Sequence, residues 1–435
     1  MKVHIQSDLT LSKNFSKPII SLLGLTIFFL LFATSLFNSD VFVLLTVITS
    51  ILLIDLMRRF IHYQSMFILF FYMFIFAFLF FVSGIGLISL TTGPYQNNIY
   101  YYHVLETFSI FIFVLWLILP QKISYEESKG QISHFFIRKS NILLFYINIL
   151  IMLFIAIFGF TGQSIFTTGS YGKSLESGSA LFGLAIYGYF PIFILTAFKY
   201  MRNNVIDKFL FWSIIIFYIL KTLSLGGRGN ILTIVLILFI LFFEGRISYK
   251  ILFLLGILLG FMLVLLGIIR GNTTQINIFY QIPRAFQIQN MFSNQIYVIY
   301  SSAAIQSLRS SKIFDPATLF YYFLLFILSI FLPSHYLPVQ SNLALLVQKY
   351  APVVGGGLIN SYFYAWFGII GVIVIALYLG LVLRKLSKKR SQALIVYQIL
   401  ILSYFPTWFS YSPSNIFKLC VFGVIVFELF KILEN

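Results

Sequence analysis

Long apolar runs separated by short polar segments dominate this chain of 435 residues. A helix of about 20 apolar residues crosses the ~30 Å hydrocarbon core of a bilayer. The runs show no alternation of apolar and polar residues with a period of two, which a transmembrane barrel would require. They are therefore predicted to be membrane-spanning helices, which satisfy their backbone hydrogen bonds internally. The runs occupy residues 19–37, 41–57, 66–89, 104–119, 142–160, 180–198, 209–225, 231–243, 251–269, 319–332, 359–383, 393–409 and 416–433.

Composition supports this class of protein. Apolar residues make up 60% of the chain and charged residues only 9%, whereas soluble domains carry roughly 25% charged residues. So few charges do not cover a water-facing surface of this size, which excludes a soluble enzyme. We therefore expect an all-α polytopic membrane protein in which residues 1–435 form a single integral membrane domain.

The positions of lysine and arginine predict the topology, because short basic loops stay on the cytoplasmic side. Residues 1–17 are polar, lack a signal-peptide cleavage site and are predicted to lie in the cytoplasm. Every second loop through the ninth run is then basic and cytoplasmic. These loops contain Arg58, Arg59, Lys122, Lys129, Arg138, Lys139, Lys199, Arg202, Lys208, Arg246 and Lys250.

One run breaks this alternation. The basic cluster at residues 384–390 would lie outside if residues 319–332 crossed the membrane. That run has only about 14 residues, which is more typical of a re-entrant or interfacial segment. We therefore predict about twelve transmembrane helices plus one such segment, with both termini in the cytoplasm and a long outer region at residues 270–357. A further crossing at residues 342–354 is the alternative, but Gln348, Lys349 and Pro352 argue against it.

Several lysines and arginines lie on the predicted outer side of the membrane, where the positive-inside rule disfavours them. Five of these cations lie in the region 270–357, whose one acidic residue is Asp315. Arginine binds phosphate through two parallel hydrogen bonds and stays protonated. The excess therefore indicates a site for an anionic phosphate or diphosphate head group, and the alternative is a loop whose cations reach lipid phosphates. The outer cations are Lys173, Arg228, Arg270, Arg284, Arg309, Lys312 and Lys349.

Two cations near a glycine-rich turn are sharper candidates. Arg228 stands in Gly226-Gly227-Arg228-Gly229, between two apolar runs. Glycines allow a tight turn and close approach of a ligand, and the start of the following helix favours an anion. Lys221 lies about two turns earlier, within a predicted span, where an ionisable residue is a functional candidate. Alternatively, Lys221 pairs with a carboxylate from another helix or extends toward the membrane surface.

His335 is the candidate for acid–base chemistry. It is the one histidine of the region 270–357 and lies between Pro333 and Pro338. Its imidazole titrates near neutral pH and would deprotonate a sugar hydroxyl. The alternative is an interfacial histidine bonded to backbone. The five histidines show no metal-ligand spacing, and a single cysteine, Cys420, forms neither an intrachain disulfide nor a cysteine zinc site.

Two stretches, taken with the hydropathy profile, carry a family resemblance. The first is the turn that contains Arg228. The second is the Gly355-Gly356-Gly357 triplet, followed by Tyr364, Phe367-Gly368 and Gly371 at the start of an apolar run. The chain resembles the oligosaccharide repeat-unit polymerases of the Wzy (O-antigen polymerase) type along nearly its whole length. Family members often have a carboxylate shortly before the tyrosine of the second motif, but this chain has Ser361 and Tyr362, so that role is not carried over.

The resemblance implies a metal-independent, cofactor-free glycosyltransferase with the C-type helical architecture, in the bacterial inner (cytoplasmic) membrane. It would join glycans carried on undecaprenyl diphosphate into a surface polysaccharide on the outer face, with arginines holding the diphosphate. Arg228 matches the family position, and Arg270, Arg284 and Arg309 are candidates by location. Tyr364 of the second motif and Lys221 are further candidates for substrate binding. Implied partners are lipid-linked glycans, membrane lipids and a chain-length regulator protein, with no nucleic acid. O-antigen, capsule and exopolysaccharide remain open as products.

Other functions fit part of this pattern. A flippase for lipid-linked oligosaccharides also has about twelve spans, but its cations would line a central cavity. A glycan ligase would share both the fold and the arginines. A metal-dependent enzyme using a lipid-monophosphate sugar needs paired acidic residues in the first outer loop, and residues 38–40 supply only Asp40.

Overall fold

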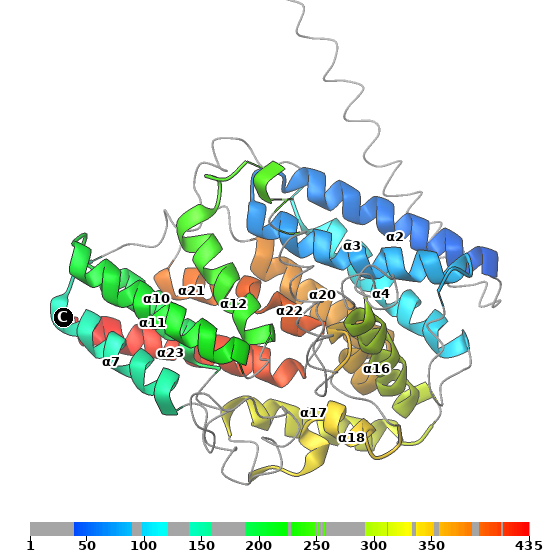
Figure 1. The fold of residues 1–435 in the computed structure, drawn as a ribbon. Helices are drawn as coiled ribbons and strands as arrows, with labels where there is room; N and C mark the ends of the chain where they lie inside the picture. Colours follow the sequence, from blue (N-terminus) through cyan, green and yellow to red (C-terminus); the bar gives the residue numbers. More distant parts are fainter. Residues whose placement is uncertain are drawn as a thin grey trace, which may run out of the picture.

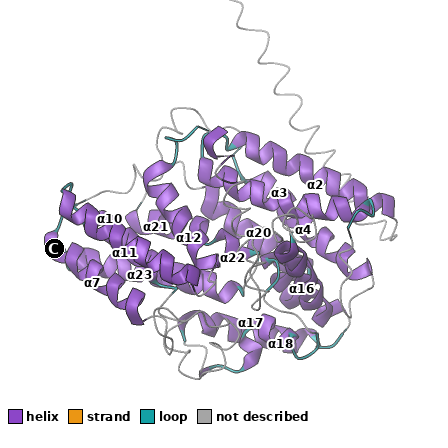
Figure 2. Ribbon diagram, in the orientation of Figure 1, coloured by secondary structure: helices purple, strands orange, loops and turns teal. Residues whose placement is uncertain are grey.

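The computed structural model describes most of the predicted spans. The described residues are 39–88, 98–120, 139–158, 188–224, 228–248, 250–252, 254, 256, 292–310, 312–332, 336–351, 356–384, 391–409 and 412–434. Within these ranges the chain is helical, with short connecting loops and no strand (Figure 2). The predicted all-α class is confirmed for this part of the chain.

The first half of the chain supplies α2 to η1, where η1 is a short π-helix. Helices α2, α3 and α4 lie side by side, and α7, α10 and α11 form a second group (Figure 1). The bounds are α2 Ser39–Arg59, α3 Gln64–Gly84, α4 Asn98–Ile118, α7 Ile142–Phe158, α10 Phe190–Tyr200, α11 Val205–Ser224, α12 Arg228–Leu238 and η1 Phe239–Phe243.

The second half joins these two groups. Helix α20 packs along α4, while α23 contacts α10 and α21. Helices α17 and α18 lie together at the lower edge of Figure 1. The bounds are α16 Ser293–Ser310, α17 Pro316–Phe331, the 3-10 helix η3 Val339–Ser341, α18 Leu343–Val347, α19 Ile359–Phe367, α20 Ile369–Arg384, α21 Gln392–Ser403, α22 Phe405–Trp408 and α23 Pro413–Ile432.

In the part of the chain that the structure describes, three helices have the length and hydropathy of membrane spans. They cover Asp40–Arg59, Gln64–Gly84 and Tyr101–Ile118, within α2, α3 and α4. Several shorter apolar helices of 10–17 residues accompany them, among them α7, α17 and α20. The first predicted span, residues 19–37, and most of the ninth, residues 251–269, lie outside the described residues. The total of about twelve crossings and the interfacial role of residues 319–332 stay predictions.

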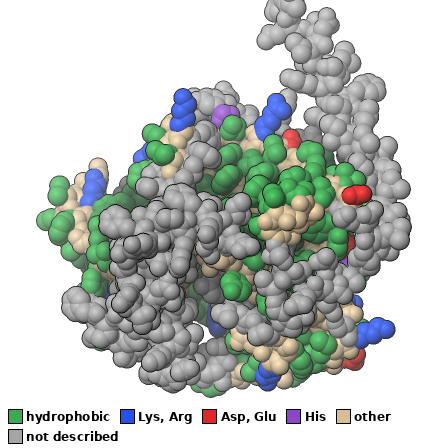
Figure 3. All heavy atoms as spheres, turned by 45° about the vertical axis from the view of Figure 1, so that its right-hand side comes forward, with side chains coloured by type: hydrophobic (Ala, Val, Ile, Leu, Met, Phe, Trp, Pro, Cys, Tyr) green, Lys and Arg blue, Asp and Glu red, His purple; other side chains and the backbone are tan. Residues whose placement is uncertain are grey.

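The surface of the outermost helices is apolar, as a bilayer requires. Leu44, Ile51 and Ile54 of α2 are at least half exposed, and Val205 and Phe209 of α11 are exposed further still. Continuous exposed apolar surface of this kind is rare on soluble monomers. On the face shown in Figure 3, apolar side chains cover much of the described surface, and Lys and Arg lie chiefly toward its edges. These helices therefore present a lipid-facing surface.

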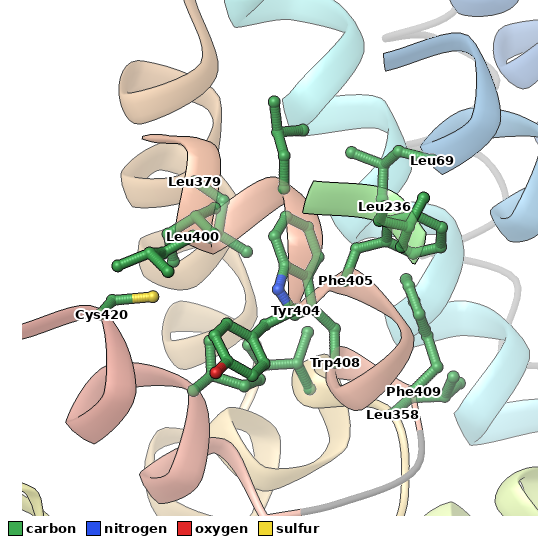
Figure 4. Packing of buried hydrophobic residues seen from close by; sticks show 14 of the residues in the cluster. Leu69, Leu236, Leu358, Leu379, Leu400, Tyr404, Phe405, Trp408, Phe409 and Cys420 are labelled. Atoms are coloured by element: carbon green, nitrogen blue, oxygen red, sulfur yellow. The ribbon is translucent and has the colours of Figure 1, made fainter. Parts of the chain in front are cut away.

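The interior is packed with large apolar side chains from distant parts of the chain. Trp408 of α22 is fully buried among residues of α3, α12, α20 and α21 (Figure 4). Leu69, Leu236, Leu379 and Leu400 come from these four helices. The short α22 thus lies in the core of the bundle. Cys420 is buried there with a free thiol.

Two predicted spans are each divided into two helices. Residues 359–383 form α19 and α20, separated at Gly368, which has φ +66°. Glycine adopts this left-handed conformation without the steric cost that a side chain adds. A Cβ at Gly371 would clash with the carbonyl oxygen of Phe363, so this glycine allows α19 and α20 to approach each other closely. Residues 393–409 divide similarly into α21 and α22, just before Pro406.

Helix ends that the topology assigns to one side of the membrane meet in the structure. The carboxylate of Glu434, just after α23, binds the ammonium groups of Lys139 at 2.7 Å and Lys199 at 2.9 Å. Burial raises the pKa of Glu434, but hydrogen bonds from these two lysines outweigh it, so the pKa falls from its usual 4.5 to about 2. This ion cluster, the Glu434 anchor, joins the start of α7 and the ends of α10 and α23, as the predicted alternation requires.

Candidate functional site

The seven predicted site residues differ in how far the structure describes them. Arg270, Arg284 and His335 lie outside the described residues. Arg228 is the first residue of α12, as the predicted helix start requires, but its side chain is not among those described. Lys221, Arg309 and Tyr364 are described with their side chains. The site is therefore built from these last three residues and their surroundings.

Lys221 binds the end of a neighbouring helix. Its Nζ donates to the carbonyl oxygens of Ala156 at 2.8 Å and Ile157 at 2.7 Å. These carbonyls belong to the last turn of α7, where helix carbonyls lack intrahelical partners and a cation is favoured. The Lys221 side chain is buried between α11 and α7. The lysine thus contacts another helix, as one alternative from the sequence expected, but through backbone carbonyls and not through the carboxylate that this alternative named.

Arg309 and Tyr364, by contrast, come together near the end of α19. The Arg309 guanidinium donates from Nη1 to the carbonyl oxygen of Trp366 at 3.1 Å. It also lies against Gly368, because a Cβ at that glycine would be 3.5 Å from Nε of Arg309. Tyr364 is within electrostatic range of Arg309. Two residues 55 positions apart in sequence, each predicted for the site, therefore share one region.

Local structure explains why Arg309 is held there. Helix α19 ends at Phe367 because Gly368 takes up the left-handed conformation that stops the helix. Its last carbonyls lack partners within the helix, and the Trp366 carbonyl accepts from Arg309 instead. Only this one of the five guanidinium N–H groups is seen to donate within the described part of the chain. The Arg309 side chain is partly exposed, so the other N–H groups can reach an anion.

A carboxylate from α4 completes this group. Glu106 lies within electrostatic range of the Tyr364 hydroxyl, as Arg309 does. Its Oε2 is 3.3 Å from Nδ1 of His103, one turn earlier on the same helix. The Glu106 and His103 side chains are 37% and 31% exposed, so both are reachable from outside the protein. We call Glu106, Arg309 and Tyr364, with His103, the outer charged group.

A buried set of polar side chains lies beside this group and joins the same three helices. Thr107 Oγ1 accepts from Gln306 Nε2 at 2.7 Å and from Asn360 Nδ2 at 3.0 Å. Gln306 Nε2 also donates to Ser361 Oγ at 3.0 Å. All four residues are at most 1% exposed. Thr107, Gln306, Asn360 and Ser361 form what we call the polar cluster.

The polar cluster sets the positions of the outer charged group through helix geometry. Glu106 directly precedes Thr107 on α4. Arg309 follows Gln306 by three residues on α16, and residues three or four apart lie on the same face of a helix. Tyr364 follows Asn360 by four residues on α19. Hydrogen bonds inside the cluster therefore hold the three functional side chains in register.

Ser361 lies in the region where members of the family that the sequence resembles often have a carboxylate. Its hydroxyl is buried in the polar cluster and accepts from Gln306. The negative charge near Tyr364 comes instead from Glu106 on another helix. The departure from the family pattern thus coincides with a carboxylate supplied from elsewhere in the fold.

Taken together, the group has three chemical capacities. A guanidinium with unused donors binds the oxygens of a phosphate or diphosphate. A partly exposed carboxylate accepts a proton, and a tyrosine hydroxyl donates or accepts a hydrogen bond. Helix α16 brings the guanidinium and helix α4 brings the carboxylate. Anion binding by the guanidinium and proton transfer to the carboxylate are therefore available in neighbouring positions.

Sequence reasoning missed Glu106 and the polar cluster. Glu106 lies inside the predicted span 104–119, and an ionisable residue within a span is itself a signal of function. We interpreted Lys221 as a candidate on this ground, but not Glu106. The amides of Gln306 and Asn360 give no such signal, because buried and exposed amides look alike in a single sequence.

Comparisons of the chain with protein-family models, with curated proteins and with solved structures gave no match.

Proposed function

We propose that this protein polymerises oligosaccharide repeat units carried on undecaprenyl diphosphate, on the outer face of a bacterial inner membrane. The observation that supports this proposal most is the meeting of Arg309 and Tyr364 beside Glu106. Such a polymerase needs a cation for the leaving diphosphate and polar groups for the sugars. The apolar surface of the outer helices suits a substrate with a long lipid chain.

In this proposal the arginines hold the diphosphate. Arg309 faces it from α16, and Arg228 contributes from the start of α12, with Arg270 and Arg284 as further candidates from the outer region. Positive charge close to the departing oxygen stabilises the negative charge that develops as the glycosidic bond breaks. Tyr364 binds a sugar hydroxyl or the diphosphate. His335 remains a candidate for acid–base chemistry.

The site as proposed belongs to a C-type membrane glycosyltransferase with about twelve spans and both termini in the cytoplasm. It uses neither a metal nor a cofactor. Its partners are the lipid-linked donor and acceptor glycans, the surrounding lipids and a protein that regulates chain length. A flippase would need its cations in a central cavity, whereas Arg309 is partly exposed at the end of α16.

The test replaces the gene with variants at matched protein levels and separates the cell-surface glycan on a gel. We expect Arg309→Ala and Arg228→Ala to abolish long chains while single repeat units still reach the surface. Lys312→Ala is the matched control, because it removes an exposed cation three positions from Arg309 and should leave long chains intact.

Other results would favour a different function. Repeat units that accumulate on the cytoplasmic side would identify a flippase. Long chains that form normally but are not transferred to their final carrier would identify a ligase. Full-length surface chains in both arginine variants would contradict the proposed role of these residues.

A further inference from the structure

Glu106 differs from most of the other described carboxylates in its surroundings. Asp55, Asp207, Glu428 and Glu434 are each paired with a lysine or arginine, Asp315 accepts a hydrogen bond from the first turn of α17, and the buried Glu244 accepts hydrogen bonds from Ser65. These pairings give each of them a structural role. Glu106 contacts the His103 ring 3.3 Å away, and its side chain is 37% exposed, which leaves the carboxylate accessible.

Glu106 lies where a charged side chain costs free energy, inside an apolar helix. It lies in the ninth position of α4, a helix with the length and hydropathy of a membrane span. Charged side chains inside such helices are expensive and usually mark a functional path. Glu106 forms no ion pair with Arg309 within the described part of the chain, although both act electrostatically on Tyr364. The two charges therefore do not neutralise each other, and each remains available to a ligand.

We propose that Glu106 is the general base that activates the acceptor sugar, an assignment that rests on the polymerase function proposed above. Its carboxylate takes the proton from the acceptor hydroxyl while that oxygen forms a bond to the anomeric carbon of the donor. The bond between this carbon and the diphosphate oxygen breaks. The electron pair leaves with undecaprenyl diphosphate, whose charge Arg309 faces, and Glu106 later returns the proton to water.

This assignment gives the departure at Ser361 a chemical meaning. The second motif lacks a carboxylate, and its serine is used to build the polar cluster. The base then comes from α4, and Thr107, directly after Glu106, locks α4 to α16 and α19. Base and diphosphate-binding arginine are thereby placed by one set of hydrogen bonds.

The experiment uses the purified full chain in proteoliposomes with a lipid-linked repeat unit carried on undecaprenyl diphosphate. We expect Glu106→Gln to lower kcat by about 10²- to 10⁴-fold, the usual contribution of a general base, with binding of the lipid-linked unit unchanged. Glu428→Gln is the matched control, since it makes the same change at an exposed pair with Lys431. It should keep the wild-type rate.

The pH profile provides a second measurement. The wild-type rate should fall at acid pH as the base becomes protonated, and E106Q should lose that acid limb. The titratable groups beside Glu106 are His103, which contacts it, and Tyr364, which lies within its electrostatic range. Both of them, and Arg309, are unchanged in this variant. If E106Q does not fold, the shorter side chain of Glu106→Asp provides the test. It displaces the carboxylate by about 1 Å, which should lower the rate on the order of 10²-fold if Glu106 is the base.

The outcomes separate the two proposals. Failure of the wild-type protein to lengthen the glycan would overturn the polymerase function and this assignment with it. A wild-type protein that polymerises, together with E106Q or E106D at the wild-type rate and pH profile, would overturn the role of Glu106 alone.

Discussion

Removal of the Thr107 hydroxyl tests whether the polar cluster holds the helices of the site together. Thr107→Val keeps the shape of the side chain but removes the acceptor of the two hydrogen bonds from Gln306 and Asn360. Hydrogen bonds between membrane helices average about 0.6 kcal/mol and reach about 1.7 kcal/mol. The loss of both should therefore lower the free energy of unfolding by about 1–3 kcal/mol, because both amides stay buried without that partner.

A matched control lies in α2. Thr46 is also fully buried, and its hydroxyl donates to the carbonyl three residues earlier, as that of Thr107 does. Thr46→Val therefore removes the same local bond, and the difference between the two variants isolates the bonds between helices. The assay is equilibrium unfolding in detergent micelles with increasing SDS. Equal losses in the two variants, within about 0.5 kcal/mol, would refute the reasoning, and only T107V should also slow glycan polymerisation.

Two further predictions concern the fold around the site. Gly371→Ala should destabilise the protein by more than about 2 kcal/mol in the same assay, since its Cβ would clash with the Phe363 carbonyl oxygen. Gly256→Ala should be tolerated, because no atom of the described residues lies within 4 Å of a Cβ at that position. Because the pKa of Glu434 is lowered to about 2, its stabilising contribution should be full above pH 4.5 and be lost as the pH falls toward 2. Thermal unfolding of wild type and Glu434→Gln should therefore differ at pH 7 and converge near pH 2, and a constant difference would contradict the assignment.

The helices themselves were largely predictable. Residues 41–57, 142–160 and 416–433 match α2, α7 and α23 within a few residues, because continuous apolar sequence in a membrane has few structural options. The breaks inside residues 359–383 and 393–409 were not predicted. A hydropathy pattern averages over single residues, and a conformation such as that of Gly368 leaves the average unchanged.

Helix α16 was missed altogether. Its sequence contains serines and glutamines, and this polarity led us to interpret it as part of an outer region. The structure buries those polar groups against α4 and α19, where they bond to one another. Hydropathy cannot distinguish a polar residue that faces water from one that faces another polar residue in a core.

The candidate site was predictable only in part. Arg309 and Tyr364 were predicted separately, one from its charge and one from a motif, and the structure brings them together. Lys221 was a candidate from its depth in a span, and its ammonium instead binds the end of α7. The contribution of Glu106 depends on α4 lying beside α19, a contact between segments more than 250 residues apart, which a single sequence does not encode locally.

The distance that separates the members of the polar cluster has a consequence for biosynthesis. Thr107 bonds to residues 199 and 253 positions further along the chain. During translation α4 is completed long before α16, and α19 later still, so Asn360 finds its partner only after most of the protein has been made. An intermediate that ends before α19 has a guanidinium and a carboxylate but lacks the helix that aligns them. The growing chain therefore gains the complete candidate site only near the end of its synthesis, and a half-assembled protein does not carry it.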